Sequence, residues 1–257
     1  MRVGIVGCGA IGSTIARAIA GGVVKAQLVA LLDMYPEKCR DSASLTGAMI
    51  CRDISCLLNT NIELVVEAAS QSAVKDIVPE LLRRGVNVVL LSVGALLDKE
   101  TYDKVLSAAK SSGAIVYIPS GAIGGVDAVK ALSLSNISKV VLRTSKSYKA
   151  LGLREEEGDK LLFKGPASEA VKKYPANINV AATLTLASGV EAEVEIWAKR
   201  ELDANIHEIE VLSDASRLYV RVENKPHPHN PKTSYLAVLS AIRLLKQVCE
   251  GGILIGT

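Results

Sequence analysis

The stretch that decides the fold is Arg2-Val-Gly-Ile-Val6, followed at once by Gly7-Cys-Gly-Ala-Ile-Gly12. The first part is an apolar run typical of a buried strand, and a helical pattern follows the last glycine. In such a turn Gly7 permits a tight bend, Gly9 lets the backbone approach a pyrophosphate, and Gly12 lets the helix pack closely on the strand. Free N–H groups at the helix start then face the phosphates. The residues expected to contact a dinucleotide here are Gly7, Gly9, Ala10, Ile11 and Gly12.

An acidic residue ends the second predicted strand. Asp33 follows Leu31-Leu32 and lies about 20 residues after Gly12, where a carboxylate accepts hydrogen bonds from the adenosine ribose hydroxyls. The alternative, in which Asp33 only caps the next helix, is disfavoured because strand, glycines, helix and acid all agree. Its negative charge favours NAD over NADP, although Lys38 and Arg40 stand close enough to blur that preference. The expected cofactor is NAD or NADP.

Residues 1–119 alternate between short β-type runs and helical patterns. Strand, helix, strand, repeated, predicts right-handed crossovers and a mainly parallel sheet, the doubly wound α/β Rossmann domain. The expected strands are Arg2–Val6, Gln27–Leu32, Glu63–Ala68, Val86–Ser92 and Ala114–Ile118, and the helices are Ile11–Ala20, Ala73–Arg84 and Lys99–Ser111. Ligands bind beyond the carboxyl ends of such strands, which nominates Ala69, Ser70, Ser92, Val93 and Gly94 as further cofactor contacts.

The pattern changes in residues 120–230. Apolar and polar residues alternate there, which is typical of antiparallel strands with one covered face, so an α+β domain for catalysis and oligomerisation is expected. Its strands are predicted at Lys139–Ser145, Glu191–Lys199, Asn205–Leu212 and Arg217–Glu223, with helices at Ala167–Tyr174 and Ile178–Ala187. In residues 231–257 the helix Ser234–Cys249 is expected to pack back on the Rossmann domain.

Composition excludes several classes of function. The formal net charge is +3 and the basic residues are dispersed, so nucleic acid is a poor partner. No apolar run reaches the roughly 18 to 20 residues of a membrane span. The five cysteines include no CxxC pair, and we expect reduced thiols in a cytoplasmic protein, with a disulfide between two of them as the less favoured alternative.

The sequence holds three histidines, His207, His227 and His229. His227 and His229 stand two apart in a Pro-rich stretch without a nearby carboxylate or thiol, so a solvated turn is expected there and no metal site. His207 opens a predicted strand of the second domain, where a structural role is the plain alternative. A histidine titrates near neutral pH and can act as acid or base, which makes His207 the candidate catalytic residue.

Five segments, in order, resemble the L-aspartate dehydrogenase family. They are Glu67-Ala-Ala-Ser70, Pro119-Ser-Gly-Ala-Ile-Gly-Gly-Val-Asp127, Ala176-Asn-Ile-Asn-Val-Ala-Ala182, Asn205-Ile-His207 and Asn230-Pro-Lys-Thr-Ser234. The Ser-Gly-Ala-Ile-Gly-Gly block followed by Asn-x-Asn-Val-Ala is the most specific pair. Other members often carry Asp-Pro shortly before the Asn-x-His, where this chain has Lys199-Arg-Glu201; the departure concerns that loop and not the histidine.

The resemblance implies an NAD(P)-dependent oxidative deamination of L-aspartate to iminoaspartate, which hydrolyses to oxaloacetate and ammonia or feeds NAD biosynthesis. The family's catalytic histidine falls on His207, and its contacts near the nicotinamide fall on Ala122 and on Asn179 or Asn177. We prefer Asn179 because it best preserves the spacing to the histidine. Hydride leaves Cα of the substrate, and His207 activates the water that attacks the imine, with Asp203 a candidate to orient it.

A substrate with two carboxylates needs cations or several N–H donors. The sequence does not choose among Arg143, Lys146, Lys149 and Lys232, and the turn Gly121–Gly125 offers backbone N–H groups instead. We also expect a homodimer or tetramer through the second-domain sheet.

Two rival readings stay open. Homoserine dehydrogenase and dihydrodipicolinate reductase share the two-domain plan, but we find no His-His pair with a downstream Lys of the reductase type. The Glu-Lys-Pro motif of the sugar and inositol dehydrogenases is also absent from the sequence. A non-catalytic NAD-binding regulator would have kept the fold and lost the chemistry. His207, within a matching Asn-Ile-His, argues against it.

Overall fold

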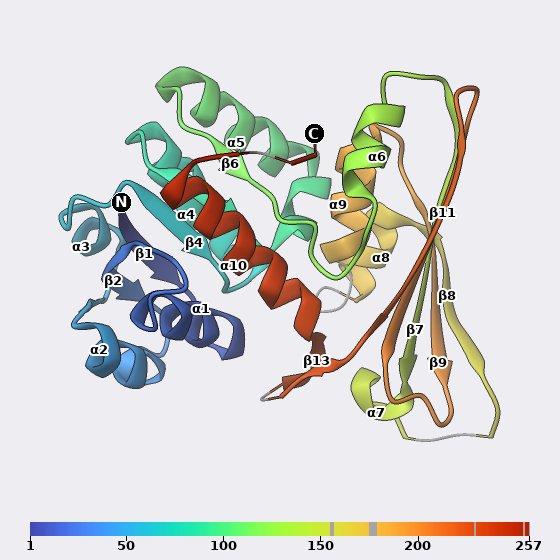
Figure 1. Ribbon diagram of the computed structural model, residues 1–257, viewed down its shortest axis with the longest axis horizontal. Coiled ribbons are helices and arrows are strands. Elements are labelled where there is room, and N and C mark those ends of the chain that lie inside the picture. Colours follow the sequence, from blue (N-terminus) through green and yellow to red (C-terminus); the bar gives the residue numbers. More distant parts are fainter. Residues whose placement is uncertain (155–156, 175–178, 229, 254, 257) are drawn as a thin grey trace. The chain divides into compact units, whose positions relative to one another are not determined.

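The computed structural model describes residues 1–154, 157–174, 179–228, 230–253 and 255–256, without the side chains of Pro231 and Lys232. The chain divides into two compact units. The first unit is Met1–Pro119 with Val238–Leu254, and the second is Ser120–Ala237 with Ile255–Thr257. Each unit is described by itself below (Figure 1).

The first unit is built on a parallel sheet with the strand order β3-β2-β1-β4-β5-β6. Each strand pair is parallel, and the predicted doubly wound Rossmann architecture is confirmed. Neighbours β2 and β4 flank β1, so the chain reverses direction across the sheet there, and a ligand crevice opens at such a point. The strands are β1 (Arg2–Val6), β2 (Gln27–Leu32), β3 (Met49–Cys51), β4 (Leu64–Glu67), β5 (Asn87–Leu90) and β6 (Val116–Tyr117).

Helices cover both faces of this sheet, with α1 and α10 on one face and α4 and α5 on the other (Figure 1). Ala241 and Leu245 of α10 share a buried cluster with Ile15 of α1 and Ile5 of β1, so the last helix completes the core of this unit. The helices are α1 (Ala10–Ala20), η1 (Pro36–Cys39), α2 (Arg40–Thr46), α3 (Ile54–Leu58), α4 (Gln71–Arg83), η2 (Val93–Leu97), α5 (Lys99–Ser112) and α10 (Tyr235–Glu250).

The second unit is built on a sheet with the strand order β11-β10-β7-β9-β8. Three of its pairings are antiparallel, as predicted, but β7 and β9 run parallel, so the sheet is mixed. The strands are β7 (Ile137–Ser147), β8 (Lys160–Pro166), β9 (Glu193–Lys199), β10 (Asn205–Ser213) and β11 (Arg217–Asn224), and a small separate pair joins β12 (Pro226–His227) to β13 (Asn230–Ser234).

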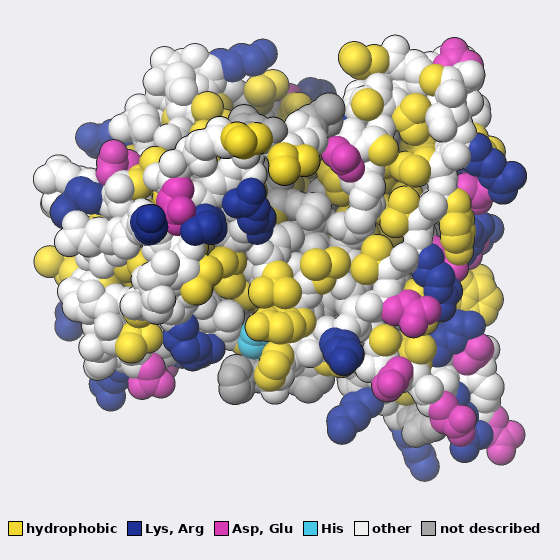
Figure 2. Space-filling view, viewed as in Figure 1, with side chains coloured by type: hydrophobic (Ala, Val, Ile, Leu, Met, Phe, Trp, Pro, Cys, Tyr) yellow, Lys and Arg dark blue, Asp and Glu magenta, His cyan; other side chains and the backbone are white. Residues whose placement is uncertain are grey.

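The two faces of the second sheet differ in chemistry. On one face, helix α9 (Asn179–Ser188) contacts β7, and α6 (Val126–Leu132) and α8 (Ala167–Lys173) pack against α9; the short α7 (Tyr148–Leu151) follows β7. The other face carries ion pairs, among them Arg143–Glu195 at 3.2 Å and Arg217–Glu210 at 3.2 Å. In Figure 2 side chains of both charges gather over β11 and its neighbours.

The expectation of reduced cysteines is wrong for four of the five. Disulfides join Cys8 to Cys39 and Cys51 to Cys56, while Cys249 is a free thiol. Cys8 and Cys39 are far apart in sequence and meet only because α1 and β2 return the chain to the first turn, a proximity that residue spacing does not reveal. Because the two disulfides form, the expectation of reduced thiols no longer supports a reducing compartment for this protein.

No helix in the described parts of the chain is long and apolar enough to cross a membrane.

Candidate active site

The glycine turn after β1 has the geometry that its sequence predicts. Gly7 adopts a φ of +97°, and a Cβ there would come within 2.6 Å of the Ala68 backbone. A Cβ on Gly12 would collide with the carbonyl oxygen of Gly7, whereas one on Gly9 would meet nothing within 4 Å. Gly7 and Gly12 are therefore required by the fold. Gly9 leaves an open cradle at the N-terminus of α1, and the dinucleotide predicted from the sequence fits there.

Asp33 is tied to this turn. One carboxylate oxygen, Oδ2, accepts a 2.7 Å hydrogen bond from the Cys8 backbone N–H, and Oδ1 accepts one of 2.9 Å from Tyr35 N–H. Each carboxylate oxygen has more than one lone pair, so the group keeps capacity for ribose hydroxyls. Asp33 thus holds the phosphate turn in shape and presents an acceptor beside it.

A cleft of about 660 Å³ lies at the carboxyl ends of β1, β2 and β4. It brings together a subset of the predicted cofactor contacts, namely Gly7, Gly9, Asp33, Ala69 and Ser70. Lys38 and Arg52 also line it, and the Lys38 ammonium lies 4.4 Å from the centre of the Tyr35 ring. The cleft therefore offers the Asp33 carboxylate and two cations to the adenosine end of a dinucleotide, and Asp53 and Asp76 line it as well.

The other predicted contacts of this unit lie outside the lining of that cleft. Ala10, Ile11 and Gly12 form the first turn of α1, directly after the glycine cradle. Ser92 precedes η2, and Val93 and Gly94 begin it, all three buried. Because Val93 and Gly94 are buried, these positions would meet a ligand through their backbone.

Glu67 is a site residue to which the sequence analysis gave no role. Its carboxylate is 1% exposed and accepts hydrogen bonds from the N–H groups of Ala69 and Ser70, and from both N–H and Oγ–H of Ser92, at 2.9 to 3.0 Å. Burial raises the pKa of this carboxyl, against four hydrogen bonds that lower it. Glu67 therefore fastens the turn after β4 to the turn after β5. The available signal was an acid at the last position of the otherwise apolar Leu64-Val-Val-Glu67 run.

In the second unit, Ala122 is buried and its carbonyl oxygen accepts a 3.0 Å hydrogen bond from Asn224 Nδ2. Asn179 is half-buried and begins α9, where its carbonyl accepts from Thr183 Oγ. Asn177, the alternative to Asn179, lies outside the described residues. The contacts of Ala122 and of Asn179 or Asn177 with the nicotinamide stay predictions.

His207 lies on β10 and is 3% exposed. Its Nδ1 is 3.0 Å from Thr144 Oγ of β7, and the two residues are direct partners in the strand register. Burial, together with the charge of Lys146, lowers the pKa of His207 to about 3, so the ring is neutral at neutral pH. Thr144 thus holds the ring, and Asp203, which the sequence offered only as a candidate for that role, is exposed on the loop before β10.

The structure separates the four cations proposed for substrate carboxylates. Lys146 is 4% exposed and follows Thr144 by two residues on β7, so both side chains lie on the His207 face. Arg143 points to the opposite face, where it pairs with Glu195 and Glu210. Lys149 is exposed, and the Lys232 side chain lies outside the described part. Lys146 is thus the cation placed beside the histidine.

His227 lies on β12, in the small sheet separate from the one that carries His207. His227 is 3% exposed and packs edge-on against the Tyr235 ring, with centroids 5.5 Å apart, so the predicted solvated turn is wrong at this position. Polar and Pro-rich flanks suggested solvent, whereas β12 and β13 bury the ring. His229 lies outside the described residues. Within the described residues, no group of three or more His, Cys, Asp or Glu side chains could hold a metal ion.

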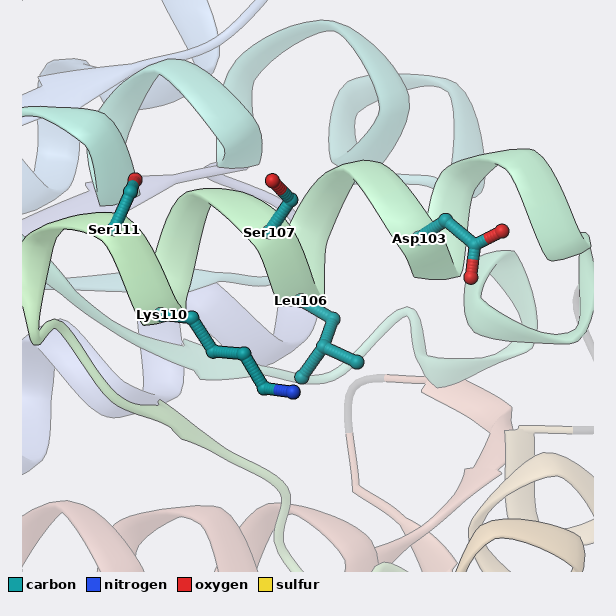
Figure 3. Close-up of a pocket in the computed structure, with 5 residues that line it drawn as sticks. All are labelled: Asp103, Leu106, Ser107, Lys110 and Ser111. Carbon is teal, nitrogen blue, oxygen red and sulfur yellow. The ribbon is translucent and has the colours of Figure 1, made fainter.

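A further hollow, of about 480 Å³, lies along α5 and is lined by Asp103, Leu106, Ser107, Lys110 and Ser111 (Figure 3). These side chains come from successive turns of one helix, and we assign no chemistry to them.

Comparison with known proteins supports both units. A family model described as "Homoserine dehydrogenase, NAD binding domain" matches residues 7–119, and one described as "Aspartate dehydrogenase, C-terminal" matches residues 127–248. The first match agrees with the glycine cradle and Asp33, and it confirms that the cofactor is NAD or NADP.

Relatives match over nearly the whole chain. The L-aspartate dehydrogenase of Methanothermobacter thermautotrophicus is 44% identical over 100% of this chain and 99% of its own length, and that of Methanocaldococcus jannaschii is 42% identical over 97% of each. The solved aspartate dehydrogenase of Thermotoga maritima is 30% identical and superposes with a TM-score of 0.79, covering 100% of this chain and 99% of that one. As its sequence motifs predicted, this chain belongs to the L-aspartate dehydrogenase family.

Proposed function

We propose that this chain oxidises L-aspartate with NAD⁺ or NADP⁺ to iminoaspartate, which is then hydrolysed to oxaloacetate and ammonia. The observation that carries the proposal is a buried, neutral His207, held by Thr144 at 3.0 Å and set beside the buried Lys146. Residues 1–119 hold the dinucleotide in this proposal, and residues 120–230 supply the catalytic side chains.

The glycine cradle, Asp33 and the turns that Glu67 fastens would hold the dinucleotide, which would supply the hydride acceptor for Cα of the substrate. Asp33 favours NAD, because a 2′-phosphate would stand against its carboxylate. Lys38 and Arg52 line the same cleft and temper that preference.

His207 acts as the base of the hydrolytic step. When Nδ1–H donates to Thr144 Oγ, the lone pair on Nε2 is free to take a proton from water as that water attacks the imine carbon. That proton passes to the imine nitrogen and gives a carbinolamine. The carbinolamine hydroxyl then gives its proton to the nitrogen as C=O forms, the C–N bond breaks, and ammonia leaves. A neutral ring has the lone pair that a general base needs, and a bound dicarboxylate would raise its low pKa toward the operating pH, where a base works best.

A substrate panel tests the proposal. Purified protein is given NAD⁺ or NADP⁺ with L-aspartate, D-aspartate, L-glutamate or L-homoserine, and the absorbance of reduced cofactor is followed. Turnover with L-aspartate alone is expected. Turnover with L-homoserine instead would favour the rival named by the match to the N-terminal unit. Tight cofactor binding without turnover of any substrate would favour the non-catalytic regulator.

Assembly is part of the proposal. The charged face of the second sheet carries cations and carboxylates in alternation, among them Arg143, Glu195, Glu208, Glu210 and Arg221. A face that holds both charges can pair with its own copy about a two-fold axis. We therefore expect a homodimer, or a tetramer built from it; a single species of monomer mass in sedimentation would contradict this.

A cytoplasmic location also stays a proposal, tested by fractionation of cells that express the protein.

A further inference from the structure

We propose that Lys146, Asn205 and Asn224 form the subsite that recognises the α-amino acid end of the substrate. Lys146 and the Asn205 amide N–H₂ donate to the α-carboxylate, and the Asn224 amide oxygen accepts from the α-amino group. This inference deepens the proposed function and rests on it.

The strand register places the three side chains on one face of the sheet. His207 faces Thr144 across β10 and β7, and Asn205 faces Asn224 across β10 and β11. Asn205 precedes His207 by two residues and Lys146 follows Thr144 by two, so all point to the same side. Directly opposed side chains have Cβ atoms about 5 Å apart, and positions two residues along a strand lie about 7 Å apart. One small substrate can therefore touch the cluster and His207 together.

Two of these side chains carry polar atoms that no protein group satisfies. Among the described residues, Asn205 Nδ2 and Asn224 Oδ1 are the buried side-chain atoms without a hydrogen-bond partner. Asn205 is 1% exposed and Asn224 is 3% exposed, and a buried polar atom left unpaired is costly. Such atoms in a native fold call for an explanation, and a ligand that supplies the missing partners is one.

The chemistry of the unpaired atoms selects the ligand. Asn224 Nδ2 already donates to the Ala122 carbonyl at 3.0 Å, which fixes the amide so that the unpaired atom is the oxygen, an acceptor. Asn205 presents the opposite type, an N–H donor. An acceptor and a donor on facing residues match an amino group and a carboxylate that share one carbon atom.

Lys146 adds the positive charge that a carboxylate needs. Burial lowers its pKa to about 8, so most of the population is still protonated at pH 7, and a bound carboxylate would raise the pKa again. A lysine so deeply buried is rare, and this one lies on the sheet face that carries His207. Contacts to the carboxylate and the amino group fix two of the four substituents of Cα.

Three variants test the subsite, with Lys130→Met as the matched control because Lys130 is an exposed lysine on α6. Lys146→Met is expected to lower kcat/KM for L-aspartate about 10- to 100-fold, the loss of one hydrogen bond to a charged group. Asn205→Leu and Asn224→Leu are expected to raise KM for L-aspartate about 10-fold. Calorimetric binding of L-aspartate to the cofactor-free protein should weaken in parallel, whereas binding of succinate, which lacks the amino group, should be insensitive to Asn224→Leu.

Stability separates this role from a structural one. Asn205→Leu removes an unsatisfied donor, so its Tm should equal or exceed that of the wild type. A fall of several degrees in Tm with unchanged KM would make Asn205 a structural residue and overturn the proposal. Lys146→Met matching Lys130→Met in kcat/KM and in L-aspartate affinity would overturn it as well.

The wild type decides the proposed function separately. If it oxidises L-aspartate while the variants keep wild-type KM, the function stands and the subsite fails. If the wild type neither oxidises nor binds L-aspartate, both are contradicted.

Discussion

The two units of this protein prepare for their ligands by different means. In the first unit, glycines shape a backbone cradle that depends on the absence of side chains. A Cβ at Gly7 or Gly12 would clash with the protein backbone, and the missing Cβ at Gly9 leaves open space for a ligand. In the second unit, a sheet face presents buried polar side chains, and Thr144, Lys146, Asn205 and His207 are each less than 5% exposed. Backbone recognition leaves a trace in residue spacing, whereas side-chain recognition depends on strand register.

The largest expected effect is on the side-chain face. His207→Ala should lower kcat for L-aspartate by about 10²- to 10⁴-fold, the usual contribution of a general base, while cofactor affinity, measured by quenching of protein fluorescence, stays at the wild-type value. Thr144→Val keeps the shape but removes the hydroxyl that holds the ring, and a smaller loss in kcat is expected. Equal affinity and equal kcat in His207→Ala would remove the histidine from the mechanism.

The glycines offer a matched pair in the other unit. Gly9→Ala should leave Tm unchanged, since a Cβ there meets no protein atom, but it intrudes on the phosphate and should weaken cofactor binding about 10- to 100-fold through lost charge-assisted hydrogen bonds. Gly12→Ala should instead cost about 1–3 kcal/mol of folding free energy by overpacking. Calorimetry and cofactor titration of both variants distinguish the two; a Gly9→Ala protein with full affinity would mean that the cradle is not the phosphate site.

The titration of His207 gives a pH test. Its folded pKa of about 3 lies below the ordinary 6.5, so the folded state binds fewer protons between these values, and stability present above pH 6.5 is lost as the pH falls toward 3. From pH 7.5 to pH 5 this group should cost about 2 kcal/mol of unfolding free energy. Urea unfolding of wild type and His207→Gln at both pH values measures it; a wild-type slope identical to that of the variant would show that the ring is not held neutral.

The smallest expected effect concerns Glu67, which, like Asp33, holds backbone turns of the first unit through its side chain. Glu67→Gln turns an amide N–H₂ toward the Ser92 N–H, so one donor loses its acceptor. We expect about 1 kcal/mol less stability and a raised Kd for the cofactor, because the turns at Ala69 and Ser92 are no longer fastened. Glu100→Gln, on the exposed side of α5, is the control, and equal behaviour of the two variants would leave Glu67 without a positioning role.

Sequence alone predicted the elements that local residue patterns define. The bounds of β1 and β2 match the prediction residue for residue, because each apolar run ends at a clear break in the pattern, the glycine turn after β1 and Asp33 after β2. The short β3 and the edge strand β8 were not predicted: β3 is three residues long, and β8 carries Gly165 and Pro166, which are atypical of strands.

In the candidate site, the limit of prediction is set by distance along the chain. Asp33 and the glycines follow one another closely, and they were found. Thr144 and His207 are 63 residues apart and are joined only by the pairing of β7 with β10, so sequence proposed the neighbouring Asp203 in its place. Cys8 and Cys39 were missed for the same reason. The sequence also could not choose among the four cations proposed for the substrate carboxylates, because that choice depends on which face of the sheet each side chain occupies.

The most direct test of the account follows the hydrogen itself. Wild-type protein is given NAD⁺ and L-aspartate deuterated at Cα, and the reduced cofactor is analysed by mass spectrometry beside the keto acid product. The account predicts reduced cofactor that carries the deuterium, together with oxaloacetate and ammonia in equal amounts. Reduced cofactor without deuterium, or no reduction at all despite bound NAD⁺, would contradict it.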